Sequence, residues 1–192
     1  GRRESWIDMG VLENAVRDDL NLNAPRVFGV LDPLKIVITN YPEGKEEMVT
    51  VENNPENEAM GTREVPFGRE IYIEQDDFME VPVKKFFRMT PGKEVRLKGA
   101  YIVMCNEVVK NEDGSIKEVH CTYDPESHSG SGCQRKVKGT LHWVSAAHAV
   151  DMEIRLYDYL LKEAEGDENT NKDFLQMVNP DSLKVFQGKG EP

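Results

Sequence analysis

The chain has 192 residues, of which 24 are Lys or Arg and 35 are Asp or Glu, so its formal net charge is -11. The hydrophobic fraction of 39% is sufficient for a folded core and excludes a chain that is disordered throughout. No apolar run approaches the roughly 18 residues that span a bilayer, and no signal-like segment follows the amino terminus. We therefore expect a soluble, cytoplasmic protein with no membrane partner.

The first twenty residues are expected to form a helix, because apolar residues recur at helical spacing from Met9 to Leu20. The helix should end over residues 21–25, since Pro25 disfavours helix at the residue before it. Short β-branched and apolar runs then indicate strands. These strands are predicted at 27–31, 36–38, 48–51 and 70–73.

The longest predicted strand runs from Glu94 to Lys110, and its first part alternates Val95 and Leu97 with Arg96 and Lys98. A turn at 111–114 is predicted to lead into a returning strand at 116–123, followed by a loop at 124–134. Strands are then predicted at 137–144 and 152–161. An acidic linker at 163–171, a helix at 172–178 and a strand at 183–186 complete the predicted elements.

Many short strands separated by turn residues favour β-barrels or sandwiches over an alternating α/β fold. The last predicted strand, Leu183–Phe186, lies close to the end of the sequence, and no hairpin partner follows it. This position predicts that the chain is a fragment.

The charge is unevenly distributed along the chain. Residues 42–80 contain twelve acidic and three basic side chains, a net of -9, whereas residues 84–98 contain six basic and one acidic, a net of +5. Such a basic run can be a solvated surface or a site for a polyanion. The aromatic residues Phe86, Phe87 and Tyr101 lie within or beside it, as stacking of unpaired bases requires. Composition leaves both interpretations open.

Patterns of catalytic and metal-binding residues are weak. His120, Cys121, His128 and Cys133 lack the close pairs typical of zinc sites, and the three cysteines are expected to be reduced thiols. Ser145, His148 and Asp151 lie too close in sequence to converge readily as a catalytic triad. No GxGxxG or GxxxxGK[ST] phosphate loop is present. The residues alone therefore indicate no catalytic group, no metal and no cofactor in this chain.

Three arginines stand out by their position, and the fixed backbone of Pro25 should aim Arg26 reproducibly. Arg26 directly follows Pro25, and Arg88 and Arg96 flank the turn at 90–92. Each could be a surface ion-pair partner in a chain rich in carboxylates. Alternatively, their guanidinium groups could read the edges of unpaired bases in pairs of hydrogen bonds.

Several motifs in order along the chain resemble the anticodon-binding region of the glutaminyl-tRNA synthetase family. They are Asn23-Ala24-Pro25-Arg26, Asp32-Pro33-Leu34-Lys35, 60–67, 92–97, Cys121-Thr122-Tyr123-Asp124, 136–146 and 153–158. The resemblance implies a mainly β fold with two β-barrels after a helical connector. The implied units are a connector at 1–25, a proximal barrel at 26–41 plus 142–192, and a distal barrel at 42–141.

The resemblance also implies roles for individual residues. Arg26 matches the family arginine that reads the middle anticodon base, Arg88 one that contacts the third base, and Arg96 one that contacts the first base. Lys98 stands where the bacterial family often has another arginine, and Phe87 occupies a position that can be lysine.

Asn21 matches a polar contact to the anticodon stem, and residues 53–58 match a loop that approaches the RNA. The implied function is anticodon recognition on the tRNA for glutamine, by a monomer that supports ATP-dependent attachment of glutamine. ATP and Mg²⁺ are implied for a catalytic domain upstream, so the fragment alone should be inactive. The alternatives are the same region of an archaeal- or eukaryotic-type glutamyl-tRNA synthetase, an acidic protein-interaction module and, more remotely, a metal-dependent hydrolase.

Overall fold

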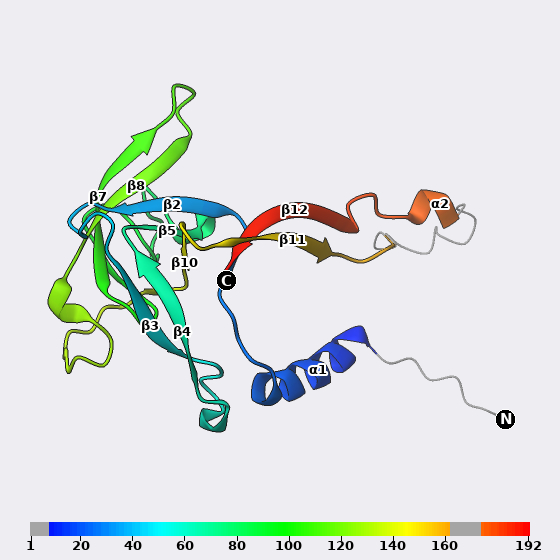
Figure 1. The fold of residues 1–192 in the computed structure, drawn as a ribbon. Coiled ribbons are helices and arrows are strands. Elements are labelled where there is room, and N and C mark those ends of the chain that lie inside the picture. Colours follow the sequence, from blue (N-terminus) through cyan, green and yellow to red (C-terminus); the bar gives the residue numbers. More distant parts are fainter. Residues whose placement is uncertain (1–7, 162–173) are drawn as a thin grey trace.

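The computed structural model describes residues 8–161 and 174–192 (Figure 1). Of the helix predicted over the first twenty residues, residues 1–7 lie outside the described ranges and the rest is confirmed as α1, Met9–Asn23. Its first turn is capped by the Asp8 carboxylate, which accepts from the Gly10 N–H at 2.7 Å. The predicted linker at 163–171 lies outside the described residues. Of the predicted helix at 172–178, the structure describes α2, Phe174–Met177. None of the helices in the described ranges is long and apolar enough to cross a membrane.

The main sheet has seven strands and confirms the mainly β class. Its order is β10-β5-β2-β8-β7-β6-β9, with parallel pairing of β2 with β8 and of β6 with β9 and antiparallel pairing elsewhere. The strands are β2 Pro33–Ile38, β5 Glu70–Glu74, β6 Glu94–Leu97, β7 Ile102–Lys110, β8 Ile116–Tyr123, β9 Thr140–Leu141 and β10 Val144–Ser145.

The prediction of one continuous strand over 94–110 is wrong, because β6 and β7 pair with each other as an antiparallel hairpin. The chain reverses at Gly99, whose φ of 75° is accessible to glycine at little cost, and the Ala100 N–H donates to the Leu97 carbonyl at 2.9 Å. The predicted alternation within β6 is confirmed, since Val95 and Leu97 are buried and Arg96 is half-buried on the other face. The predicted strand at 137–144 is likewise divided between β9 and β10.

A two-stranded ribbon is formed by β3, Glu46–Glu52, and β4, Thr62–Gly68, with the short 3-10 helix Glu58–Met60 between them. Sequence reasoning did not predict β4, because Pro66 and several charged residues interrupt its apolar pattern. Pro66 is tolerated here because its strand pairs on one side only, with β3.

The third sheet has the order β1-β12-β11, formed by β1 Gly29–Val30, β11 Val150–Tyr157 and β12 Leu183–Gly190. The last predicted strand therefore extends past Phe186 and finds its partners earlier in the chain (Figure 1). The barrel assignment of the sequence stays a prediction. The sequence assigns β2 to the proximal barrel and β5 and β8 to the distal barrel. In the structure, β2 hydrogen-bonds to both β5 and β8.

The core contains an aromatic cluster that joins the β3–β4 ribbon to the main sheet. The Phe67 ring lies 5.1 Å from Trp143, 5.4 Å from Tyr41 and 5.5 Å from Tyr101, measured between centroids. The hydroxyls of Tyr41 and Tyr101 both donate to Glu47 Oε1 at 2.8 Å. Burial of these phenols is possible because one carboxylate satisfies both donors.

Alkaline pH should weaken the fold through these two tyrosines. Burial, followed by the hydrogen bond to Glu47, raises the pKa of both Tyr41 and Tyr101 well above the ordinary tyrosine value. Their stabilising effect is therefore complete below about pH 10 and is lost as the pH rises further, because the unfolded chain ionises first. We expect the unfolding free energy, measured with urea, to fall above that pH. The fall should be shallower in Tyr101→Phe, and an equally steep fall in that variant would contradict this origin.

Arg63 and Glu191 form a two-pronged ion pair between β4 and the end of the chain. Arg63 Nε lies 2.7 Å from Glu191 Oε1, Arg63 Nη2 lies 3.0 Å from Oε2, and the side chains are only 20% and 9% exposed. Phe28 lies against this pair, with its N–H donating to Glu191 Oε2 at 3.1 Å and the guanidinium carbon 5.3 Å from its ring centroid. The pair thus fixes β12 and residue 28 to the β3–β4 ribbon.

Replacing Glu191 by Gln should lower the unfolding free energy by about 3 kcal/mol, because Arg63 would keep its charge in a largely buried place without its partner. Denaturant titration measures the effect. The control is Glu153→Gln, which breaks an exposed pair with Arg155 and should change stability by less than about 1 kcal/mol. Equal effects of the two substitutions would refute the role given to the buried pair.

Candidate nucleic-acid interface

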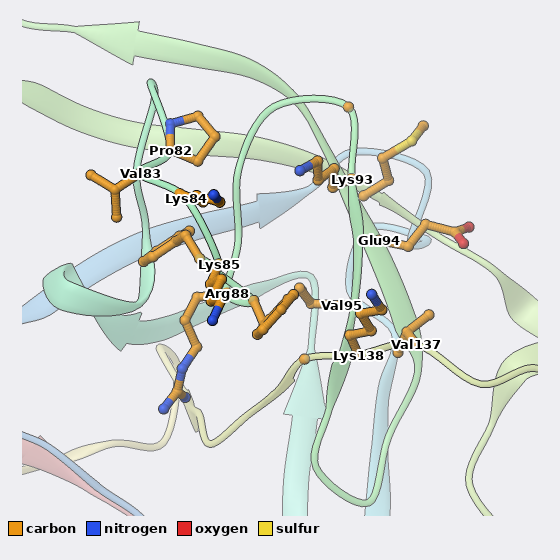
Figure 2. Close-up of a pocket in the computed structure, with 15 residues that line it drawn as sticks. Pro82, Val83, Lys84, Lys85, Arg88, Lys93, Glu94, Val95, Val137 and Lys138 are labelled. Atoms are coloured by element: carbon orange, nitrogen blue, oxygen red, sulfur yellow. The ribbon is translucent and has the colours of Figure 1, made fainter.

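A basic pocket of about 730 Å³ opens between the loop at 82–88, the start of β6 and residues 137–139 (Figure 2). The loop contributes Lys84, Lys85 and Arg88, and the segment before β6 contributes Lys93. Lys138 joins them from the second basic cluster of the sequence. The polypeptide therefore brings two separate basic segments to one cavity.

The one acidic residue in this lining is paired with a cation from outside the lining. Glu94 lies at the rim, and Arg135 Nη2 contacts its two carboxylate oxygens at 2.6 and 2.7 Å. Arg135 also pairs with Asp124. Because five cationic side chains line the pocket and Glu94 is its one acidic residue, the pocket presents a positive field, as a phosphate or an electronegative base edge requires.

Phe87 gives the pocket an aromatic wall. Its side chain is 51% exposed, and Lys138 Nζ lies 5.2 Å from the ring centroid, within the range of a cation–π contact. Behind the ring, the Phe87 carbonyl is so close to Gly139 that a Cβ there would lie 2.1 Å from its oxygen. This close approach fixes the loop against the segment before β9 that carries Lys138.

Of the five tRNA-contact residues expected from the sequence, all of which are described, only Arg88 lines this pocket. Its Nη1 lies 3.1 Å from Asp77 Oδ1, and its side chain is 49% exposed. Arg88 is thus anchored at one side and accessible at the other. The sequence did not predict the role of Asp77, because one carboxylate eleven residues before Arg88 forms no recognisable motif with it.

Arg96 is held by a neighbouring loop. Its Nη1 donates to the carbonyl of Ser127 at 2.8 Å, to Ser129 Oγ at 3.2 Å and to the carbonyl of Ala100 at 3.4 Å. Lys98 Nζ lies 6.0 Å from the centroid of the Phe28 ring, and its carbonyl accepts from the Trp143 indole N–H at 3.0 Å. The two predicted residues therefore contact different elements.

Arg26 and Asn21 lie together where α1 ends. Arg26 Nη2 donates to the Asn21 carbonyl at 3.2 Å and to Glu56 Oε1 at 3.1 Å. Asn54 Nδ2 donates to the same Asn21 carbonyl at 2.8 Å. The loop at 53–58, which the sequence places near RNA, is thereby joined to both candidate residues.

The other chemistry-bearing residues are engaged elsewhere. His148 Nε2 lies 2.9 Å from Glu46 Oε1, Lys189 pairs with Asp151, and Ser145 is buried. His120 lies 2.8 Å from Glu118. Within residues 8–161 and 174–192, no cluster of three or more His, Cys, Asp or Glu side chains is placed to hold a metal ion.

Comparison with known proteins identifies the fold family. The family model for the anticodon-binding domain of class I tRNA synthetases (E and Q) matches residues 24–124, and a second model of the same description matches residues 140–192. The chain belongs to this family. The family resemblance of the sequence is thereby confirmed.

Curated members with this anticodon-binding domain include close relatives. The chain is 53% identical over 192 residues to a glutamine–tRNA ligase of Clostridium perfringens, covering 100% of this chain and 35% of the relative. It is 54% identical over 189 residues to that of Clostridioides difficile, and 53% identical over 192 residues to that of Nitrobacter hamburgensis; these matches cover 98% and 100% of this chain and 34% of each relative. The chain thus spans about a third of the curated relatives it matches.

Gly139→Ala should deform the pocket of this anticodon-binding domain. The added methyl group would meet the Phe87 carbonyl at 2.1 Å and Val95 Cγ1 at 3.2 Å, so the loop must move. We expect a loss of about 1–3 kcal/mol in unfolding free energy, measured by denaturant titration. Gly68→Ala is the matched control, because a Cβ there comes no closer than 3.8 Å to the Lys45 carbonyl. Unchanged stability in Gly139→Ala would contradict the tight contact.

Proposed function

We propose that the chain binds the anticodon arm of the tRNA for glutamine, as the anticodon-binding part of a glutamine–tRNA ligase. The observation that carries this proposal is the basic, aromatic-lined pocket around Arg88 in a chain whose net charge is -11. A strongly acidic protein has little nonspecific attraction for RNA, so binding must rest on locally placed cations. The identity to glutamine–tRNA ligases supports the choice of tRNA.

The candidate cations suit recognition of separated, unpaired bases. Arg88 and Phe87 both line the pocket, and their side chains are 49% and 51% exposed, so the pocket offers a base both an aromatic face and a guanidinium. Arg26 and Arg96 are held by other loops, away from this pocket lining. We assign the third anticodon base to Arg88, the middle base to Arg26 and the first base to Arg96. Lys98 adds a positive charge near the first base, and Asn21 contacts the stem.

The third base distinguishes glutamine from glutamate anticodons, because the former end in guanine and the latter in cytosine. Guanine offers O6 and N7 as two adjacent acceptors, which match the arginine fork, whereas cytosine presents an amino donor at the corresponding edge. The Arg88 pocket therefore favours the glutamine anticodon over the glutamate anticodon of the rival synthetase family.

The proposal includes the finer architecture of the family. We assign residues 26–41 plus 142–192 to a proximal barrel, 42–141 to a distal barrel and 1–25 to a connector. The curved main sheet and the β11–β12 ribbon are the strands from which those barrels would be built. The whole ligase would be a cytoplasmic monomer that attaches glutamine with ATP and Mg²⁺. This chain carries no GxGxxG or GxxxxGK[ST] phosphate loop, so we place ATP binding outside its 192 residues.

The test is competition binding of the 192-residue chain to anticodon stem-loop RNAs whose loops carry the anticodon CUG or CUC, measured at low salt. We expect preference for CUG, and Arg88→Ala should reduce that preference about tenfold, the scale of one paired arginine–guanine contact. Arg155→Ala is the control, since this exposed arginine on β11 pairs with Glu153 outside the pocket.

Three outcomes would each decide against part of the proposal. Preference for CUC would favour the glutamyl-type alternative. Absence of RNA binding, together with retention of a basic protein partner, would favour the acidic interaction module. Loss of preference in Arg155→Ala as large as in Arg88→Ala would remove the assignment of the pocket.

A further inference from the structure

We propose that Asp77 is a positioning residue that holds the guanidinium of Arg88 in one orientation at the basic pocket, and that selection of the third anticodon base depends on this contact. The inference rests on the proposed function, and it concerns a residue that does not itself line the pocket. Three observations support it: backbone hydrogen bonds place the two residues side by side, their side chains are unequally buried, and one oxygen of the Asp77 carboxylate has no hydrogen-bond partner among the described residues.

The backbone fixes the two side chains relative to each other. Asp77 ends the short 3-10 helix Gln75–Asp77, and its carbonyl accepts from the Met89 N–H at 2.9 Å. The Met79 N–H in turn donates to the Met89 carbonyl at 3.1 Å. Met89 directly follows Arg88 and is buried, so this pair of bonds holds the start of the Arg88 side chain against Asp77.

Burial of the ion pair is asymmetric. The Asp77 side chain is 10% exposed, whereas that of Arg88 is 49% exposed, and the closest atoms are Oδ1 and Nη1 at 3.1 Å. The carboxylate is thus a fixed point inside the protein, while about half of the Arg88 side chain is open to solvent at the pocket that it lines. Within the described ranges, Arg88 has no other polar side-chain partner, so its orientation rests on this contact.

Burial of the Asp77 carboxylate is unfavourable for the stability of the fold. Its second oxygen, Oδ2, is buried and has no hydrogen-bond partner among the described residues. Burial raises the pKa of Asp77, and the nearby charges of Arg88 and His142 lower it, while Glu74 and Asp76 add to the rise. A carboxylate in such surroundings contributes little net stability, as is typical of buried ion pairs. Its main effect falls on the orientation of Arg88.

Orientation matters because guanine is read by two parallel hydrogen bonds. A guanidinium that rotates freely loses more conformational entropy on binding, and it can also satisfy other base edges. Anchoring Nη1 on Asp77 limits rotation of the fork and leaves its other nitrogens without a protein carboxylate partner among the described residues. Release of the anchor should therefore reduce the distinction between guanine and cytosine more than it reduces affinity.

The experiment is a double-mutant cycle on the full 192-residue chain with Asp77→Asn and Arg88→Gln, read as the ratio of dissociation constants for the CUC and CUG stem-loops. Asparagine has the shape of aspartate without its charge. We expect Asp77→Asn to reduce the ratio about five- to tenfold and to have no further effect when Arg88 is already Gln. Glu80→Gln is the matched control: it removes one negative charge close by in sequence, breaks the exposed Lys110 pair and should leave the ratio unchanged.

A second readout needs no RNA. The Arg88 Nε–H signal, identified in ¹⁵N NMR spectra by its loss in Arg88→Gln, should show restricted motion in the unmodified chain and increased motion in Asp77→Asn. Unchanged Arg88 dynamics in Asp77→Asn would overturn the inference, as would an equal gain in affinity for both stem-loops. If the unmodified chain shows no CUG preference, the proposed function fails instead, and the NMR result still decides whether Asp77 orients Arg88.

Discussion

The convergence of two buried phenol groups on Glu47 is the constraint on which the arrangement of the sheets depends. Tyr41 follows β2 and Tyr101 precedes β7, whereas Glu47 belongs to β3, so the shared acceptor joins the main sheet to the β3–β4 ribbon. Each phenol ring also contacts Phe67, Tyr41 edge-to-face and Tyr101 at a tilt. The ribbon cannot slide by one residue without turning Glu47 to the other face and leaving two donors buried without an acceptor. Polar satisfaction, rather than apolar area alone, therefore sets the register at this junction.

The three candidate arginines share one property: the guanidinium of each already contacts acceptor oxygens of the protein. Arg26 is held by Glu56, Arg88 by Asp77, and Arg96 by carbonyl and hydroxyl oxygens of the loop after β8. Such side chains lose less conformational entropy when a base arrives. The surrounding carboxylates also weaken attraction for polyanions in general, so a chain of this charge gains discrimination at the expense of nonspecific affinity.

Local patterns predicted the parts of the fold that local physics controls. The helical spacing of the amino terminus and the turn before Ile116 were predicted, because spacing and turn residues suffice to specify them. The break at Gly99 was missed, since one glycine in an alternating run does not reveal a positive φ. At the candidate site, Arg88 was predicted from its family position, whereas Asp77 and the Lys138–Phe87 contact depend on pairings between distant segments. Long-range contacts of this kind leave no periodic trace in a sequence.

The poor burial of α1 has a consequence for the cooperativity of the molecule. None of its residues is buried, and among the described residues the side chains of Arg26, Asn54 and Asn57 donate to carbonyls of its last turn. Figure 1 shows the helix lying apart from the sheets. A helix of 15 residues has marginal stability in water without packing. We therefore expect it to open as a separate unit at a small free energy, while the sheets stay intact. Unfolding of the chain should then proceed in steps, with helical ellipticity lost before the environment of the buried Trp143 changes.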